Sequence, residues 1–260
     1  MAAIQYSPLF AAGYYFWNAT RKPWSDARVR RALTLMVPWN TIRTEDNFFA
    51  PTSVLVLPFA GYESPRGIEK QDRDQALKLL AAAGYPQGRK LPPVRIVTYD
   101  SDIHIRSVEA MREAWTELGV TVEHIVVPAD RTIRDARQDG FSLSFTSWIG
   151  DFADPAAFLL MWTGDSGLNE AGYRSRDYDG LIARSMDEDG RERLKTLALA
   201  ERKLLADAPL IPLYHSVSFN VIDTGYITGW YQNPLDIHPF KDLGFGIPKA
   251  RPFVARGAGR

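Results

Sequence analysis

The feature that most constrains the fold is an alternation of apolar strands and helices in the middle of the chain. The apolar run at 94–97 reads as a buried strand and that at 120–127 as another strand, and the helices that follow each of them end at Gly119 and Gly140. The run 141–147 alternates apolar residues with serines, which predicts a half-buried strand. Strands that alternate with crossover helices predict an α/β architecture.

The helix between the first two of these strands has a clear inner face. Its apolar residues recur at spacings of three and four, the period of an amphipathic helix: Val108, Met111, Ala114, Trp115 and Leu118. We therefore expect Trp115 to be buried against the sheet.

The first part of the chain predicts a strand, two helices and a long loop. The aromatic run 14–17 favours a strand, and Pro23 and Asp26 introduce a helix. The apolar face of that helix contains Val29, Ala32, Leu33 and Met36, and its arginines, Arg28, Arg30 and Arg31, are expected to form a solvated face. Pro38 interrupts the pattern before a second short helix, and residues 48–70 read as a structured loop.

The following helix begins at Asp72, has Ala76, Leu79, Leu80 and Ala83 on its inner face, and ends at Gly84. Further on, residues 175–206 are predicted to be helical, with Glu201 as the one polar member of the apolar stripe. Two strands are expected at 210–214 and 217–222, and the tail from Arg251 is expected to be frayed.

Composition excludes several classes of protein. Lys and Arg number 31 and Asp and Glu number 31, so the zero net charge argues against a broad nucleic-acid-binding surface. Without cysteine, the chain has no disulfide, thiolate metal site or cysteine nucleophile. It also contains no P-loop and no GxGxxG after a strand. No apolar run approaches the roughly 20 residues that span a bilayer.

The segment 147–155 is the strongest candidate for a binding site, because it lies where a strand ends and a helix begins. Asp154 before Pro155 has the pattern of a helix N-cap. Asp151 has no such structural role, and Trp148 lies three residues before it, so a carboxylate and an aromatic wall are placed to meet a ligand ammonium group. The alternative for Asp151 is a turn-forming residue.

Other polar patterns are less specific. Gly164-Asp165-Ser166-Gly167 is similar to a protease nucleophile loop, but these are also ordinary turn residues. The four histidines, His104, His124, His215 and His238, have no metal-ligand spacing. His215 follows a predicted strand, where it is placed to face a pocket.

Together these segments resemble the C-terminal half of the peptide/nickel-type (family 5) substrate-binding proteins of bacterial ABC transporters. The resemblance rests on four segments in the same order as in that family: 18–32, 148–155, 173–179 and 200–214. It implies the C-terminal lobe of a periplasmic-binding-protein-like fold (type II, cluster C), with a mixed sheet flanked by helices.

The resemblance also implies a function. It predicts a non-enzymatic receptor, periplasmic or lipid-anchored, that binds a peptide or small solute and delivers it to an ABC permease, without a cofactor or a metal. The Asp matching Asp151 pairs with the α-amino group of the ligand, and the Trp matching Trp148 lines the pocket. Ile149, Gly150 and His215 complete the expected site.

Two departures bear on specificity. Pro38 stands where the family usually has an Asp, and Phe145, Thr146 and Ser147 stand where some tripeptide-preferring members place a basic residue. The family's chains are about twice as long, so we expect a fragment: 1–45 as the end of the first lobe, 46–215 as the binding lobe, and 216–260 as return strands. Such a fragment is expected to self-associate through unpaired strands.

Two alternatives to a peptide receptor stay open at this stage. One is a receptor for nickel or another non-peptide solute. The other is a hydrolase that uses Ser166 or the Asp151/Asp154 pair.

Overall fold

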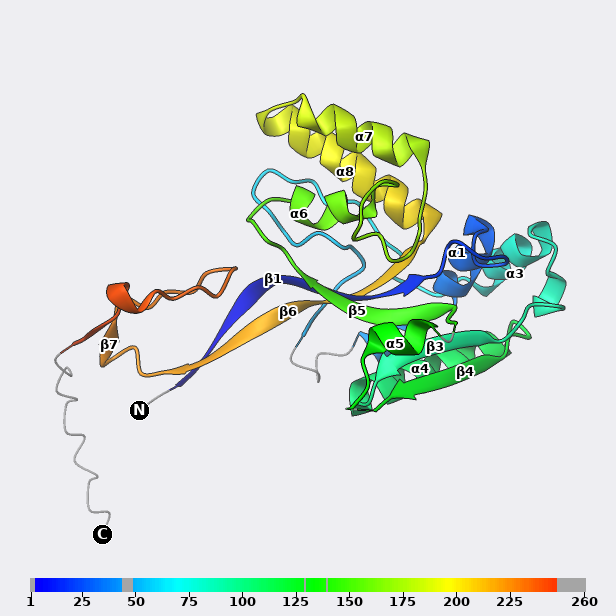
Figure 1. Ribbon diagram of the computed structural model, residues 1–260, viewed down its shortest axis with the longest axis horizontal. Helices are drawn as coiled ribbons and strands as arrows, with labels where there is room; N and C mark the ends of the chain where they lie inside the picture. The colour runs from blue at the N-terminus through cyan, green and yellow to red at the C-terminus, as the bar shows by residue number, and fades with distance from the viewer. Residues whose placement is uncertain (1–2, 44–48, 129, 139, 247–260) are drawn as a thin grey trace, which may run out of the picture. The chain divides into compact units, whose positions relative to one another are not determined.

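The computed structural model describes residues 3–43, 49–128, 130–138 and 140–246 (Figure 1). Two compact units are formed, one from residues 10–216 and one from residues 1–9 together with 217–260. The predicted frayed tail from Arg251 lies outside the described residues. Of the helices described, none is long and apolar enough to cross a membrane.

The chain contains a mixed six-stranded sheet with the strand order β2-β6-β1-β5-β3-β4 (Figure 1). Its strands are β1 (Ala3–Trp17), β2 (Ala50–Pro51), β3 (Val94–Tyr99), β4 (Val122–Val127), β5 (Leu143–Ile149) and β6 (Leu210–Ile222). β3 pairs in parallel with both β4 and β5, whereas β1 and β5 are antiparallel. The predicted α/β architecture with a mixed sheet is confirmed.

Helices connect and cover these strands. They are α1 (Ala27–Leu35), α2 (Trp39–Ile42), α3 (Arg73–Ala82), α4 (Asp102–Thr116), α5 (Ile133–Gln138), α6 (Ala156–Leu159), α7 (Arg176–Met186) and α8 (Gly190–Asp207), with 3₁₀ turns η2 (Pro86–Gly88), η3 (Leu160–Trp162) and η4 (Phe240–Asp242). Asp26 and Asp72 cap α1 and α3 through their side chains, as predicted. The region predicted as helical over 175–206 is two helices, because the chain turns at Gly190, whose φ of 52° is left-handed.

The core of the larger unit is rich in tryptophan. Trp115 is fully buried on α4, stacks on Trp17 with the ring centroids 6.0 Å apart, and donates its indole N–H to the carbonyl of Leu33 at 2.9 Å. Trp17 also stacks on Trp24 at 5.4 Å. The predicted burial of Trp115 is confirmed, and its partners come from β1 and α1.

Arg30 was wrongly assigned to a solvated face. Its side chain is buried, and its guanidinium donates hydrogen bonds to the carbonyls of Trp24, Asp207 and Ala208 at 2.7–3.2 Å. Ala208 is the left-handed C-cap of α8, so Arg30 binds carbonyls that have no partner within that helix. Helical periodicity alone does not reveal that another helix ends over this position.

Two strand predictions also need correction. The expected strands at 210–214 and 217–222 are the single strand β6, which lies between β2 and β1. In β5, Ser144 is buried with its apolar neighbours, so the expected half-buried alternation begins only at Thr146. The reason is that Arg137 covers Ser144 and donates to its hydroxyl at 2.9 Å.

The smaller unit contains β7 (Ile227–Thr228), paired in antiparallel fashion with β8 (Gly244–Phe245). Phe219 packs edge-on against Tyr6 with the centroids 5.3 Å apart. The ring of His238 stacks on Trp230 at 5.2 Å and contacts Asp236 at 3.0 Å. β6 and β8 therefore both have partners within this chain, which removes the expected reason for self-association along them.

Candidate ligand-binding site

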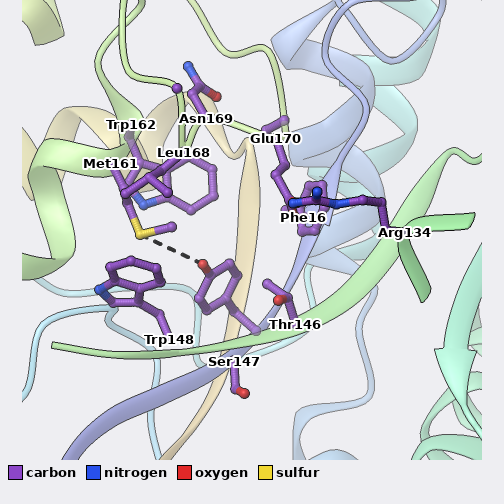
Figure 2. Close-up of a pocket in the computed structure, with 13 residues that line it drawn as sticks. Phe16, Arg134, Thr146, Ser147, Trp148, Met161, Trp162, Leu168, Asn169 and Glu170 are labelled. Atoms are coloured by element: carbon purple, nitrogen blue, oxygen red, sulfur yellow. Dashed lines mark hydrogen bonds between the residues drawn. The ribbon is translucent and has the colours of Figure 1, made fainter. Parts of the chain in front are cut away.

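A cavity of about 280 Å³ opens on one face of the β1–β5 pair (Figure 2). Its walls come from β1 and β5, from η3, from the loop 167–171 and from Arg134 on α5. In Figure 2, Trp148, Met161 and Trp162 line one side, and Phe16, Glu170 and Arg134 lie on the other. We call this cavity the aromatic pocket.

The strand register explains why these rings gather. Tyr14 on β1 lies opposite Thr146 on β5, and Ala12 lies opposite Trp148. Because residues two apart on a strand share a face, Tyr14 and Phe16 project on the same side as Thr146 and Trp148. The tight aromatic run at 14–17, interpreted from the sequence only as a strand, supplies half of this wall.

The floor of the aromatic pocket is apolar and uncharged. The Tyr14 hydroxyl lies 3.8 Å from the sulfur of Met161, and burial raises the pKa of this phenol above its usual range, so it stays neutral. Trp148 donates its indole N–H to the carbonyl of Ala157 at 2.9 Å, which orients its ring. The indole N–H of Trp162 is buried and, within the described part of the chain, has no acceptor. The pocket thus suits an apolar or aromatic group.

Two charged residues, Arg134 and Glu170, also line the aromatic pocket. Arg137 forms an ion pair with Glu170 and lies over the ring of Phe16, with 4.6 Å between the guanidinium carbon and the ring centroid. Asn169 donates to the carbonyls of Thr163 and Tyr173 at 3.0 and 2.7 Å, which fixes the loop that carries Glu170. The two contacts of Arg137 are long-range in sequence, so no local pattern predicted them.

Of the five residues predicted for the site, the aromatic pocket includes only Trp148. Asp151 is exposed just beyond the end of β5, beside Ile149, which is 60% exposed. Gly150 is buried, and a Cβ there would lie 2.5 Å from the ring of Phe10. His215 is buried in β6, opposite Ala50 of β2, and burial lowers its pKa to about 4.

Asp154 has the structural role that the sequence predicted. Its carboxylate accepts the backbone N–H of Ala156 at 2.8 Å, at the start of α6. The sequence did not predict its second partner, Arg193 on α8, which binds both carboxylate oxygens at 2.7 and 3.0 Å. This pairing and the cap lower the pKa of Asp154, although partial burial opposes them.

The hydrolase alternative was tied to Ser166 and to the two aspartates. Ser166 lies in a turn, where its hydroxyl accepts the backbone N–H of Leu168 at 3.3 Å. Two of the histidine rings contact hydroxyl groups, His124 that of Thr98 and His104 that of Ser101. Among the residues the structure places, no three potential metal ligands cluster together.

The chain thus contains a mixed α/β lobe with an aromatic pocket and an exposed carboxylate, Asp151, just after a strand. Residues 2–170 match the family described as "Bacterial extracellular solute-binding proteins, family 5 Middle". The chain belongs to this family.

Relatives and solved structures agree with this assignment. The chain is 28% identical over 255 residues to the periplasmic oligopeptide-binding protein OppA of Escherichia coli. This alignment covers 90% of this chain and 45% of the relative. It is 26% identical to the dipeptide-binding protein DppE of Bacillus subtilis over 78% of this chain. The murein tripeptide-binding protein MppA of E. coli has a similar fold (TM-score 0.78, 25% identity), covering 93% of this chain and 49% of that one. The chain spans about half the length of these relatives.

Proposed function

We propose that this chain is the ligand-binding lobe of the solute receptor of a bacterial ABC importer, and that its ligand is a peptide or a related small solute. The receptor works outside the cytoplasmic membrane, in the periplasm or anchored by lipid, and delivers the ligand to a permease. It is a binding protein and not an enzyme. The observation that carries the proposal is the placement of an exposed carboxylate, Asp151, three residues after a tryptophan that lines an aromatic pocket.

The chemistry of a peptide ligand matches this arrangement. Asp151 is exposed and is therefore available to accept a ligand ammonium group. The neighbouring Asp154, by contrast, is already engaged by Arg193 and by the backbone N–H of Ala156. A charge-assisted hydrogen bond of this kind is among the stronger polar contacts in proteins. The aromatic pocket then takes an apolar side chain, since its floor offers rings and a thioether.

Titration of the chain with a tripeptide that has an apolar side chain tests this proposal. Asp151→Asn should weaken binding at least about tenfold, because a hydrogen bond to a charged group is worth about 1.5–3 kcal/mol. In a closed two-lobed cleft the loss should reach a hundred-fold or more, as for a buried pair that loses one partner. N-acetylation of the peptide should reproduce this loss with the unaltered protein.

The matched control is Asp165→Asn, which removes the same charge from an exposed turn. It should leave the affinity unchanged. Equal binding by Asp151→Asn, or equal binding of acetylated and free peptides, would sink the ammonium-pairing role.

A non-peptide solute is the second candidate, because the relatives include heme-binding protein A of Haemophilus influenzae and a probable deoxycholate-binding protein of E. coli. A ligand of that kind would bind without regard to Asp151.

A further inference from the structure

Four arginines surround a second cavity, of about 230 Å³, which shares no lining residue with the aromatic pocket. They come from four separate segments: Arg31 on α1, Arg43 after α2, Arg66 in the loop before α3, and Arg202 on α8. We call this cavity the arginine pocket. Its other polar lining includes the hydroxyl residues Thr34 and Ser53, and no carboxylate lines it.

Arg43 is fixed within the wall of the arginine pocket. Its guanidinium lies 3.6 Å from the ring centroid of Trp39 and donates to the carbonyls of Ile68 and Pro212, both at 2.9 Å. Its Nε is buried and has no partner among the described residues. Burial lowers the pKa of Arg43 to about 9, so the group is still charged at neutral pH. A buried cation with an unused donor is a costly arrangement unless an anion approaches it.

The remaining arginines add charge that protein groups do not neutralise. Arg31 donates to the carbonyl of Ala206 at 3.3 Å, whereas Arg66 and Arg202 are exposed at the rim. Within the part of the chain that the structure describes, none of the four forms a salt bridge. Glu69, which is not part of the lining, acts to raise the pKa of Arg43 and accepts a hydrogen bond from Ser53 at 3.4 Å.

The backbone shapes one wall of the arginine pocket. A Cβ on Gly67 would lie 1.7 Å from the carbonyl oxygen of Ser53. Only glycine therefore permits the loop segments around residues 53 and 67 to approach so closely. Ser53, Arg66 and Gly67 all line the cavity, together with Arg202, Leu205 and Ala206 of α8. This part of the wall therefore depends on the close backbone packing at Gly67.

We propose that the arginine pocket binds a phosphate group. Guanidinium groups recognise phosphate in a planar, bidentate manner, and a phosphate monoester carries close to two negative charges and several acceptor oxygens. A dianion offsets the repulsion among four cations better than a carboxylate does. The volume is below the roughly 300 Å³ at which pockets for larger ligands begin, which favours a compact anion. The same chemistry is offered by free phosphate and by a phosphomonoester lipid headgroup.

The test is calorimetric titration of the chain with inorganic phosphate at low ionic strength, together with sedimentation on phosphatidylcholine vesicles with and without phosphatidic acid. Saturable phosphate binding that is weakened at least about tenfold in the double variant Arg66→Gln/Arg202→Gln supports the site, on the strength of charged hydrogen bonds. Sedimentation only with phosphatidic acid, lost in the same variant, also supports it and identifies a lipid as the source.

The control double variant is Arg106→Gln/Arg191→Gln, which removes the same charge from exposed positions on α4 and α8. It should bind phosphate like the unaltered chain. The proposal is overturned if neither phosphate nor the vesicles bind, if the control loses as much affinity as the pocket variant, or if acetate binds as tightly as phosphate. Circular dichroism of each variant verifies that it is folded before titration.

Discussion

The phenol of Tyr62 donates a hydrogen bond of 2.6 Å to the carboxylate of Glu201, a residue on α8 with no exposed surface. The second carboxylate oxygen accepts the backbone N–H groups of Leu55 and Val56 at 2.7 and 2.8 Å. One buried side chain thus anchors the loop before α3 to α8. Glu201 was the polar exception in the apolar stripe of its helix, and these three donors explain why a carboxylate is tolerated there.

This contact predicts a pH dependence of stability. Burial raises the pKa of Glu201 from 4.5 to about 7, against the three hydrogen bonds, which lower it. Because the pKa of Glu201 is higher in the folded chain than in the unfolded chain, the folded state binds the carboxyl proton more tightly. The resulting stabilisation of the fold is complete below pH 4.5 and is lost as the pH rises through 7. A shift of that size corresponds to roughly 3 kcal/mol.

The free energy of unfolding of the chain and of Glu201→Gln, measured by urea titration between pH 4.5 and 8, checks this. As the pH rises, the free energy of unfolding of the unaltered chain should fall by roughly 3 kcal/mol relative to that of Glu201→Gln, because Gln does not titrate. Tyr62→Phe should cost about 1.5–3 kcal/mol at pH 8, where the carboxylate is charged, and less at pH 5. Parallel curves for the chain and Glu201→Gln would contradict the raised pKa.

Trp115 provides a prediction about the core. Trp115→Ala should lower the free energy of unfolding by about 3–5 kcal/mol, the usual cost of truncating a buried large aromatic. The substitution removes the stacking with Trp17 and the hydrogen bond to the carbonyl of Leu33. Chemical denaturation measures the change, and a loss below about 1 kcal/mol would show that the ring does not pack as described.

Replacing Asp151 and replacing Asp154 should have different effects on the free energy of unfolding. Asp154→Ala removes a helix cap and leaves Arg193 without its carboxylate, so it should cost about 2 kcal/mol. Asp151→Ala changes an exposed residue and should stay within about 0.5 kcal/mol. Thermal and urea unfolding of both variants give these values. A large loss of stability in Asp151→Ala would indicate that this aspartate is structural.

The sequence predicted what depends on local periodicity. The alternation of β3, β4 and β5 with helices, the capping aspartates and the burial of Trp115 were all visible in local sequence patterns. It also predicted that Asp154 caps a helix, because Asp before Pro is a local pattern.

The contacts that shape the two pockets are not local. Tyr14 meets Met161 across 147 residues, and Arg43 meets the carbonyl of Pro212 across 169. Neither contact has a period in the sequence, since each depends on which strands become neighbours in the sheet. Arg43 in particular gave no signal, because one arginine after a short helix is usually a surface residue.

Arg30 provides the last prediction, on the junction between α1 and α8. Its buried guanidinium satisfies the carbonyls of Trp24, Asp207 and Ala208. Arg30→Met keeps most of the volume but leaves these carbonyls without their donor, and each buried unsatisfied group costs about 1–3 kcal/mol. The free energy of unfolding should therefore fall by roughly 3 kcal/mol or more, measured by urea denaturation.

The control is Arg184→Met, because Arg184 is exposed in a single ion pair with Glu188, and it should change stability by about 0.5 kcal/mol at most. Hydrogen exchange should show the amides at the C-terminal end of α8 opening faster in Arg30→Met than in the control, and equal protection in both variants would refute the role of Arg30 in holding that helix end.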